Sequence, residues 1–426
     1  MPFPEEFLHY LWKFRLFDQL QLQTSSGERI QILSQGIHNK DSGPDFENAR
    51  IKIGEQEWAG NVEIHLKSSD WEKHQHQTDQ AYENVILHVV HQSDKQIVRQ
   101  NHTAMPELIL ENRIPQGALL RYEELMMGLN WIPCEKLIYK IEQIHVDSWL
   151  SRMIVERLES KTNAINQILK EYKGSWDDAF YICMARNFGF KTNALPFELL
   201  ARSIPQQILA RHKENLFQIE ALLFGQAGFL EEKFTDEYPA LLKKEYRFLK
   251  AKYSLKPADK FIWKHMRLRP QNFPCIRIAQ FAVLISKSSF LFSRILEMTD
   301  VKELKMLFSD IDINIYWHTH YRFNHVSAGS SKKLGDDSIN NILINTVAVS
   351  IFAYGQQMGI QSYKDNALAL LEKIPGETNQ VLRRFNLIGL KAETSFRSQA
   401  LMHLKSFYCD YKKCLHCGIG IKLLKQ

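Results

Sequence analysis

The chain has 426 residues and a mass of 49.9 kDa, enough for two or three domains with substantial cores. Its hydrophobic fraction of 45% excludes a disordered chain, and its net charge of +6 is compatible with nucleic-acid binding. No apolar run reaches the roughly 18 residues that span a membrane, and the acidic start MPFPEEFLHY is unlike a signal peptide. We therefore expect a cytoplasmic protein without a membrane partner, and the oligomeric state stays open.

The first part of the chain, residues 1–115, has the pattern of an α/β domain. Polar and apolar side chains alternate on both sides of Gly54, which predicts a β-hairpin. A helical pattern and a compact apolar strand follow that hairpin. In chain order we expect a helix over 4–20, a strand over 29–33, a loop over 36–43, hairpin strands over 49–53 and 58–66, a helix over 70–84, and strands over 85–90, 96–100 and 106–110.

Charged side chains stand out on this hairpin. Asp45 lies at the mouth of the first strand, and Glu63, His65 and Lys67 occupy every second position of the next. The period of a strand sends these three side chains to one face of the sheet. An acid, an imidazole and an amine on one face of a core strand predict a catalytic or metal-binding site.

This order of elements resembles the core of the PD-(D/E)XK nucleases. Pro44-Asp45 corresponds to the Pro-Asp pair, and Glu63-Ile64-His65 to the Glu-x-Lys element, with His65 in place of the lysine. Lys67, on the same face, can replace the missing amine. The resemblance implies a restriction-endonuclease-like mixed sheet, with Asp45 and Glu63 binding Mg²⁺ or Mn²⁺. It also implies phosphodiester cleavage in nucleic acid, DNA more readily than RNA.

Structural explanations exist for the same residues. Gly-Pro-Asp is ordinary turn chemistry, and Glu63 with Lys67 can form an ion pair on a solvated sheet. His74 and His76 suggest a metal, but side chains two residues apart diverge on a helix, so capping a helix start is the alternative. A zinc hydrolase would require at least three of His65, His74, His76 and His88 to converge.

The remainder, residues 116–426, has the composition of a mainly α-helical domain. Helix formers in long amphipathic periods are separated by Gly, Pro or Asn. The predicted helices cover 145–172, 176–188, 195–201, 205–223 and 229–253.

A basic, aromatic stretch follows these helices. Cations are interleaved with Trp263 and Phe273 around two prolines, which suits a phosphate backbone with stacked bases. A rigid loop whose arginines cap helices is the alternative. The candidate nucleic-acid contacts are Lys264, Arg267, Arg269 and Arg277.

The end of the chain carries a cluster of three cysteines, Cys409, Cys414 and Cys417. Thiolates at this density in a reducing compartment favour zinc or an iron–sulfur cluster, with a fourth ligand from Cys134, Cys275 or His416. Some helicase-associated nucleases similarly hold a cluster with one upstream cysteine and three near the C-terminus. Reduced cysteines that only pack against the last helix are the alternative.

The whole chain resembles an uncharacterised bacterial family, domain of unknown function 2851. The strings GPDFENARI, GNVEIHLKSSDW, AYENVILHVV, LRPQNFPCIRIAQ and SQALMHLKSFYCDYKKCLHCGIG carry the resemblance, together with residues 316–323. It implies one protein type rather than a fusion, and no activity. We therefore expect a metal-dependent nuclease, or a non-catalytic nucleic-acid-binding or scaffold protein with the same fold.

Overall fold

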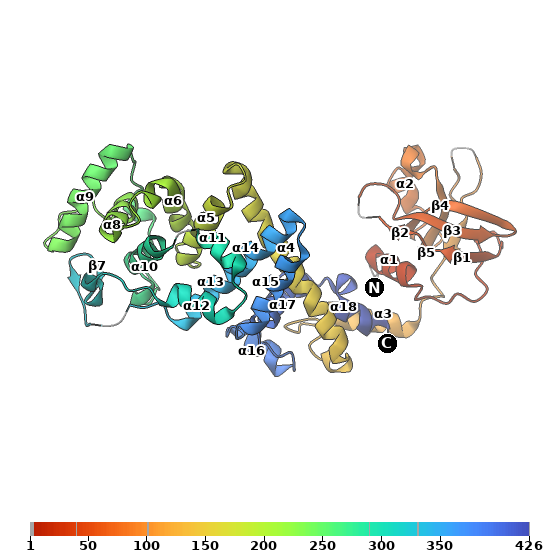
Figure 1. Cartoon of the computed structure of the whole chain (residues 1–426). Helices are drawn as coiled ribbons and strands as arrows, with labels where there is room; N and C mark the ends of the chain where they lie inside the picture. Colours follow the sequence, from red (N-terminus) through yellow and green to blue (C-terminus); the bar gives the residue numbers. More distant parts are fainter. Residues whose placement is uncertain (1–3, 40, 100–101, 289, 330–331, 426) are drawn as a thin grey trace. The chain divides into compact units, whose positions relative to one another are not determined.

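The computed structural model describes residues 4–39, 41–99, 102–288, 290–329 and 332–425 (Figure 1). The chain divides into two compact units: residues 1–149 with 404–426, and residues 150–403. The first contains a mixed β-sheet and the second is almost entirely helical, so the predicted order of an α/β part followed by a helical part is confirmed. The division itself lies further along the chain than residue 115.

The sheet of the α/β unit has the strand order β1-β3-β4-β5-β6, with β2 also paired to β3. Strands β1, β2, β3 and β4 pair antiparallel, whereas β4, β5 and β6 pair parallel. The predicted hairpin is confirmed, with Ile53 opposite Gln56 at its turn. The strands are β1 (Ile30–Ser34), β2 (Ile37–His38), β3 (Phe46–Ile53), β4 (Gln56–Lys67), β5 (Val85–Gln92) and β6 (Glu107–Ile109).

Strand β4 lies at the centre of the sheet, and both of its faces are buried near its C-terminal end. Val62 and Ile64 are fully buried on one face, and Glu63 and His65 are almost as buried on the other. Helix α1 (Glu5–Phe14) packs against β4 through its apolar stripe and ends where Arg15 adopts a left-handed conformation. Burial of acid and imidazole beside apolar neighbours requires polar partners for both.

The segment after β4 is the main departure from the predicted elements. Instead of a helix over 70–84, it forms α2 (Asp70–Lys73), η1 (His76–Thr78) and η2 (Gln80–Tyr82). Gln75 has a φ of +63°, which ends the helical path one residue after His74. The strand predicted over 96–100 is reduced to a bridge between Val98 and Ala104, and residue 100 lies outside the described residues.

The end of the chain returns to the α/β unit. Tyr10 on α1 donates a hydrogen bond to the carbonyl of Ile421 at 3.3 Å, and α18 packs against α3. The cysteine cluster therefore belongs to this unit rather than to the helical domain to which the sequence assigned it. The elements concerned are α3 (Gln116–Met127), η3 (Ile138–Lys140), η8 (Lys405–Cys409), η9 (Cys414–His416) and α18 (Gly418–Lys425).

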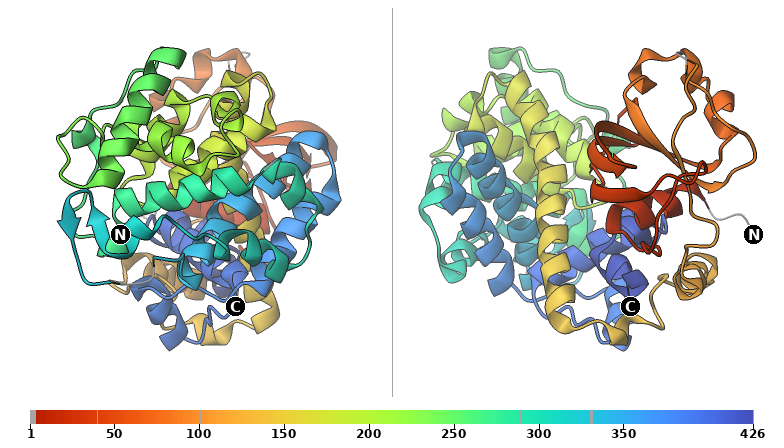
Figure 2. Two further views of the ribbon diagram at one scale, coloured as in Figure 1. Left: turned by 60° about the vertical axis from the view of Figure 1, so that its left-hand side comes forward. Right: turned by 90° about the vertical axis from the view of Figure 1, so that its right-hand side faces the viewer.

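The helical unit contains the long helix α4, which runs beside later helices of the unit (Figure 2). Arg157 on α4 donates to Oδ1 of Asn345 at 3.1 Å, and His403 lies 3.2 Å from Glu156. The elements are α4 (Gln143–Glu171), α5 (Trp176–Phe188), α6 (Ala194–Ser203), α7 (Gln206–Ala210), α8 (Leu216–Gln226), α9 (Glu237–Tyr253), η4 (Lys260–Ile262), η5 (Pro270–Asn272), α10 (Pro274–Lys287), α11 (Leu291–Glu297), α12 (Val301–Ser309), η6 (Ile315–His318), β7 (His320–Arg322), β8 (His325–Val326), α13 (Asp336–Ile342), η7 (Leu343–Val347), α14 (Ala348–Met358), α15 (Gln361–Lys373), α16 (Gln380–Leu387) and α17 (Ser395–Leu404).

A continuous helical stretch from Asp336 to Met358 is long and apolar enough to cross a membrane by length and composition. In this protein, 72% of its apolar window is buried inside the structure. That burial is typical of the core helix of a soluble protein.

Candidate metal centre

The two acids predicted from the sequence lie side by side. Phe46 pairs with Val62, so Asp45, just before β3, reaches the backbone of β4 next to Glu63. The backbone N–H of Asp45 donates to Oε2 of Glu63 at 3.1 Å, and the N–H of Ile64 donates to Oδ2 of Asp45 at 3.0 Å. These reciprocal bonds fix both carboxylates at one end of the sheet.

Three histidines converge beside Glu63. His65, His74 and His76 each present a ring nitrogen, and the three atoms lie within 4.8 Å of one another. Nε2 of His65 is 3.1 Å from Nδ1 of His74, while Oε1 of Glu63 is 3.3 Å from Nε2 of His76 and 3.6 Å from Nε2 of His65. Ligands of one tetrahedral ion at metal–nitrogen distances near 2.0 Å are roughly 3.4 Å apart, so these spacings match a shared metal.

The backbone at Gln75 produces this convergence. On a continuous helix His74 and His76 would point in different directions, as the sequence analysis assumed. The left-handed turn of Gln75 instead brings both rings against His65. The expectation that these two histidines cap a helix start is therefore wrong, and the three-imidazole condition of the zinc alternative is met.

Burial keeps His65, His76 and His88 in the neutral form. Burial lowers the pKa of His65 to about 2, with a further contribution from His88, His76 and His74. Burial also lowers the pKa of His76, and that of His88 to about 3. Neutral imidazole is the form that binds metals. Burial and the neighbouring Asp45 raise the pKa of Glu63 to about 9, so a nearby cation would offset the repulsion between the two acids.

The hydrogen bonding of the rings fits a metal as well. In the described part of the chain, the buried Nε2 of His76 has no hydrogen-bond partner. Nδ1 of His65 lies 2.8 Å from Nε2 of the fully buried His88, which can fix the orientation of the His65 ring. Metal-bound histidines commonly have their second nitrogen held by such a partner. A nitrogen-rich set of this kind suits Zn²⁺ or another transition-metal dication better than Mg²⁺.

Two further residues near the acids take different places, His9, which was not predicted, and Lys67, which was. His9 on α1 lies 3.3 Å from Oδ2 of Asp45. Burial lowers the pKa of His9, but the hydrogen bond and charge of Asp45 raise it by more, and the net change is upward. Lys67, expected beside Glu63, is exposed at the end of β4, where its backbone N–H bonds Asp70 at 3.0 Å. Lys67 therefore does not share the buried position of Glu63 and His65.

A cavity of about 450 Å³ lies next to the histidines. Trp71 and His76 line it, and the ring of Tyr82 stacks on His76 with 3.8 Å between centroids. Arg99 contributes a cation to the lining, opposed by Asp79 and Glu83. Trp71 and Tyr82 were not expected at this site, because aromatic residues in a helical pattern are usually core residues.

The basic stretch of the helical unit divides into exposed and buried cations. Lys264, Arg267 and Arg269 are exposed. Arg277 is only 4% exposed and donates to Gln280 and Ser338 at 3.0 and 3.1 Å. Trp263 is buried as well and donates to the carbonyl of Ala227 at 2.9 Å. The prediction that Arg277 contacts nucleic acid is therefore wrong, since its guanidinium is used inside the fold.

The predicted cysteine ligands lie outside the histidine group. Cys414 and Cys417 are buried, Cys409 is half-buried, and none forms a disulfide. Cys275, one of the proposed fourth ligands, belongs to the other unit, whereas Cys134 belongs to the same unit.

No curated protein and no solved structure matched the sequence. The model of the family described as "Protein of unknown function (DUF2851)" matches residues 5–380, and the chain therefore belongs to that family.

Proposed function

We propose that the α/β unit is a metal-dependent hydrolase that cleaves phosphodiester bonds in nucleic acid. The observation that carries the proposal is the convergence of His65, His74 and His76 beside the paired acids Asp45 and Glu63.

The order of elements supports a nuclease in particular. A helix (α1), an antiparallel hairpin (β3 and β4), a short helix (α2) and a parallel strand (β5) occur in this order, with β1 and β2 between the first helix and the hairpin. Asp45 precedes the first strand of the hairpin and Glu63 lies on the second, as in the PD-(D/E)XK arrangement. His65 in place of lysine shifts the donor set from oxygen towards nitrogen, which favours zinc over magnesium or manganese.

The chain's own residues have distinct roles in such a reaction. A dication held by His65, His74 and His76 would lower the pKa of a bound water molecule. Asp45 orients the imidazole of His9, and this pair can accept the proton of the attacking water. Glu63 lies beside His76 and would offset the charge of a bound cation, while His88 fixes the ring of His65.

The substrate would enter from the cavity beside His76. Its volume of about 450 Å³ admits one or two nucleotides of an extended strand rather than a folded domain. Arg99 can bind a phosphate, and the partly exposed ring of Tyr82, which stacks on His76, can contact a base.

The test uses the full-length protein with labelled single- and double-stranded DNA and RNA, in the presence of Zn²⁺, Mn²⁺ or Mg²⁺. Cleavage by the wild type should fall by about a hundredfold or more in His76→Ala, Glu63→Gln and Asp45→Asn. His102→Asn is the matched control, because His102 is exposed in the same unit and asparagine tolerates its positive φ.

Two results would reject the proposal. One is a wild-type protein that cleaves none of these substrates with any of the three metals. The other is cleavage that persists unchanged in all three site variants. Binding of nucleic acid without cleavage would instead favour the non-catalytic alternative.

A further inference from the structure

Four of the six cysteines belong to the α/β unit, and Cys134 is far in the sequence from the other three, Cys409, Cys414 and Cys417. Cys134 follows helix α3, Cys409 ends the π-helix η8, and Cys414 and Cys417 flank η9. All are free thiols, and three of the four are less than one tenth exposed. A π-helix costs stability and is found most often at functional positions.

Specific contacts hold the C-terminal segment against the loop that carries Cys134. Nζ of Lys412 donates to the carbonyl of Met126 at 2.6 Å, and Nζ of Lys405 lies 5.4 Å from the ring centre of Trp131. Cys134 is 9% exposed and lies close enough to Cys417 and Cys414 for their charges to act on it. A bound cation would neutralise the thiolates gathered there.

The turn after Cys414 has the form of a metal-binding knuckle. Burial raises the pKa of Cys417 to about 11, although the backbone N–H groups of Gly420 and Ile419 hydrogen-bond its sulfur and lower it. A Cβ on Gly420 would lie 2.3 Å from the carbonyl of Cys414, and one on Gly418 would lie 2.6 Å from Trp149. Glycine is therefore needed at both positions for the backbone to wrap around the sulfur. Hydrogen bonds to sulfur are a feature of thiolate metal sites.

We propose that Cys134, Cys409, Cys414 and Cys417 form a four-thiolate metal centre, with Cys134 as the fourth ligand that the sequence left open. The spread of the sulfurs favours an iron–sulfur cluster. In the residues that the structure describes, the donor atoms found within 4.8 Å of one another are those of the three histidines and include no thiol. A single tetrahedral zinc ion would bring its sulfurs to roughly 3.8 Å, whereas a [4Fe–4S] cluster bonds each cysteine to a different iron and holds the sulfurs further apart.

The first experiment is elemental analysis of full-length protein purified without oxygen, with iron, zinc and acid-labile sulfide measured per chain. Iron and sulfide in stoichiometric amounts support the cluster. Zinc at more than one ion per chain, with loss of one ion in Cys134→Ser, supports the four-thiolate centre and overturns its assignment to iron and sulfide. If neither iron nor zinc exceeds the amount that the histidines bind, the proposed four-thiolate centre is overturned.

The variants are chosen within the same chain. Cys134→Ser, Cys409→Ser, Cys414→Ser and Cys417→Ser should each lose most of the metal. Cys183→Ser and Cys275→Ser, which replace thiols of the helical unit, should retain it. Because a cysteine variant can fail to fold, alkylation of the native wild type provides a second readout: the four thiols should be protected until a chelator removes the metal. Alkylation of Cys134 in native metal-loaded protein would exclude it as a ligand.

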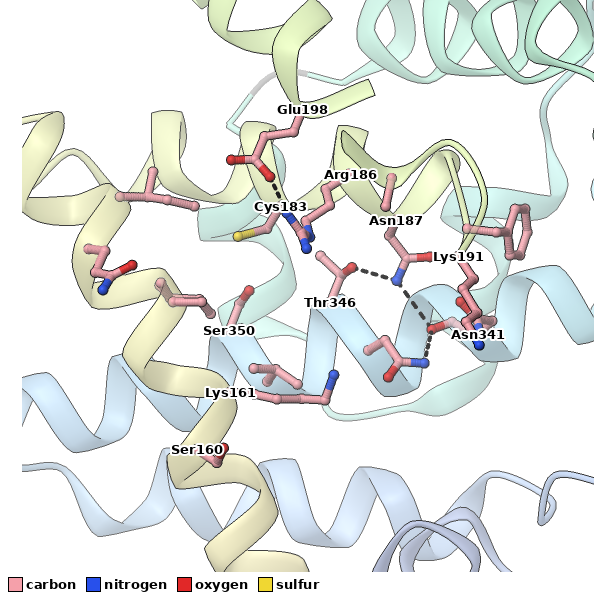
Figure 3. A pocket seen from close by; sticks show the side chains of 18 of the residues that line it. Ser160, Lys161, Cys183, Arg186, Asn187, Lys191, Glu198, Asn341, Thr346 and Ser350 are labelled. Carbon is pink, nitrogen blue, oxygen red and sulfur yellow. Dashed lines mark hydrogen bonds and ion pairs between the residues drawn. The ribbon is translucent and has the colours of Figure 1, made fainter. Parts of the chain in front are cut away.

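A separate observation in the helical unit supports a second site. A cavity of about 790 Å³ lies between α4, α5, α6 and the π-helix η7 (Figure 3). Ser350 lines it and is 2% exposed, yet its hydroxyl has no hydrogen-bond partner among the described residues, and the same holds for Oδ1 of Asn187. Orphaned polar atoms around a cavity of this size indicate a polar ligand.

The charges of the lining indicate an anion. Arg186 pairs with Glu198, and Arg202 pairs with Glu198 and Glu171, so these charges are largely balanced. Lys161 and Lys191 line the same cavity, and neither forms an ion pair with any residue that the structure describes. The amide of Asn187 donates to Thr346 at 2.8 Å and to the carbonyl of Asn341 at 3.4 Å (Figure 3), and Asn345 also lines the cavity.

We infer that this cavity binds a small molecule that carries a phosphate group and is about as large as a mononucleotide. The two lysines would bind the phosphate, the amides would hydrogen-bond polar edges, and Ile165, Ile168 and Val349 would contact an apolar ring face.

Calorimetric titration of the full-length protein with AMP, GMP, CMP, UMP, adenosine and inorganic phosphate tests this inference. At least one nucleotide should bind, more tightly than adenosine or phosphate alone, and Lys161→Met should weaken it about tenfold. Lys170→Met is the control, since Lys170 is exposed on the same helix and does not line the cavity. No binding of any nucleotide at millimolar concentration, or equal binding to Lys161→Met, would overturn the inference.

Discussion

Nε2 of His65 lies 3.1 Å from Nδ1 of His74, although the two residues are nine positions apart and the end of a strand lies between them. The contact exists because helix α2 stops after Lys73 and Gln75 takes a left-handed conformation. A single backbone torsion therefore decides whether two histidines reach the third. The metal centre depends on this local turn as much as on the residue types.

The role of Gln75 can be tested by substitution at that position. Gln75→Gly should keep the histidine arrangement, because glycine adopts positive φ without a steric penalty. Gln75→Val should cost about 1–2 kcal/mol and weaken zinc binding, because a β-branched residue resists this conformation. Competition with a zinc chelator and urea unfolding measure the two effects. Equal zinc affinity of the Gly and Val variants would show that the turn does not position the site.

Asp45→Asn should lower the pKa of His9. Oδ2 of Asp45 lies 3.3 Å from Nε2 of His9, and its negative charge favours the protonated ring. Without that charge, burial of the ring dominates, and burial favours the neutral form. Titration of the His9 ring by NMR in metal-free protein measures the shift. Asp41→Asn, on the exposed part of the same loop, should leave the titration unchanged. An unaltered His9 pKa in Asp45→Asn would contradict the proposed pair.

Much of the α/β part could be predicted from the sequence, because its signals are local. Alternation around Gly54 predicts the hairpin, and the period of the strand places Glu63 and His65 on one face. The convergence of His74 and His76 could not be predicted in the same way. Helical propensity over 70–84 favoured a continuous helix, and nothing local signals that Gln75 breaks it.

The basic stretch shows a second limit of sequence reasoning. Arg267, Arg269 and Arg277 have the same chemistry and lie close together, so the sequence treats them alike. Their surroundings differ because Arg277 is on the inner face of α10, whereas the other two precede that helix. Burial depends on elements distant in the chain, such as α13 with Ser338, which no local pattern reveals.

This difference in burial predicts that substitutions of two arginines have different effects on stability. Arg277→Met should destabilise the helical unit by about 2–4 kcal/mol, because it leaves the buried oxygen of Gln280 and the half-buried hydroxyl of Ser338 without this donor and removes the contact with Phe190. Arg269→Met should leave the unfolding midpoint unchanged, since Arg269 is exposed. Chemical denaturation of both variants measures this. Similar midpoints for the two variants would mean that Arg277 is not needed for the fold.

The last prediction concerns Glu220, which is 1% exposed on α8. Burial raises its pKa to about 7 from the ordinary value of 4.5. Below pH 4.5 the carboxyl is protonated in both the folded and the unfolded chain. Between these two values the unfolded chain ionises first, so the folded state binds more protons and loses stability as the pH rises. Above pH 7 the carboxylate of Glu220 is charged in the folded state as well, and the full free-energy cost of burying that charge lowers the stability of the fold.

Glu220→Gln removes this dependence, because an amide does not titrate. The variant should exceed the wild type in unfolding free energy at pH 8.5 by up to about 3 kcal/mol, and the difference should vanish near pH 4. Urea unfolding of the full-length protein at a series of pH values measures the difference. Glu214→Gln, at an exposed position just before the same helix, serves as the control and should follow the wild type. A gain that is the same at every pH would show that charge burial at Glu220 is not its cause.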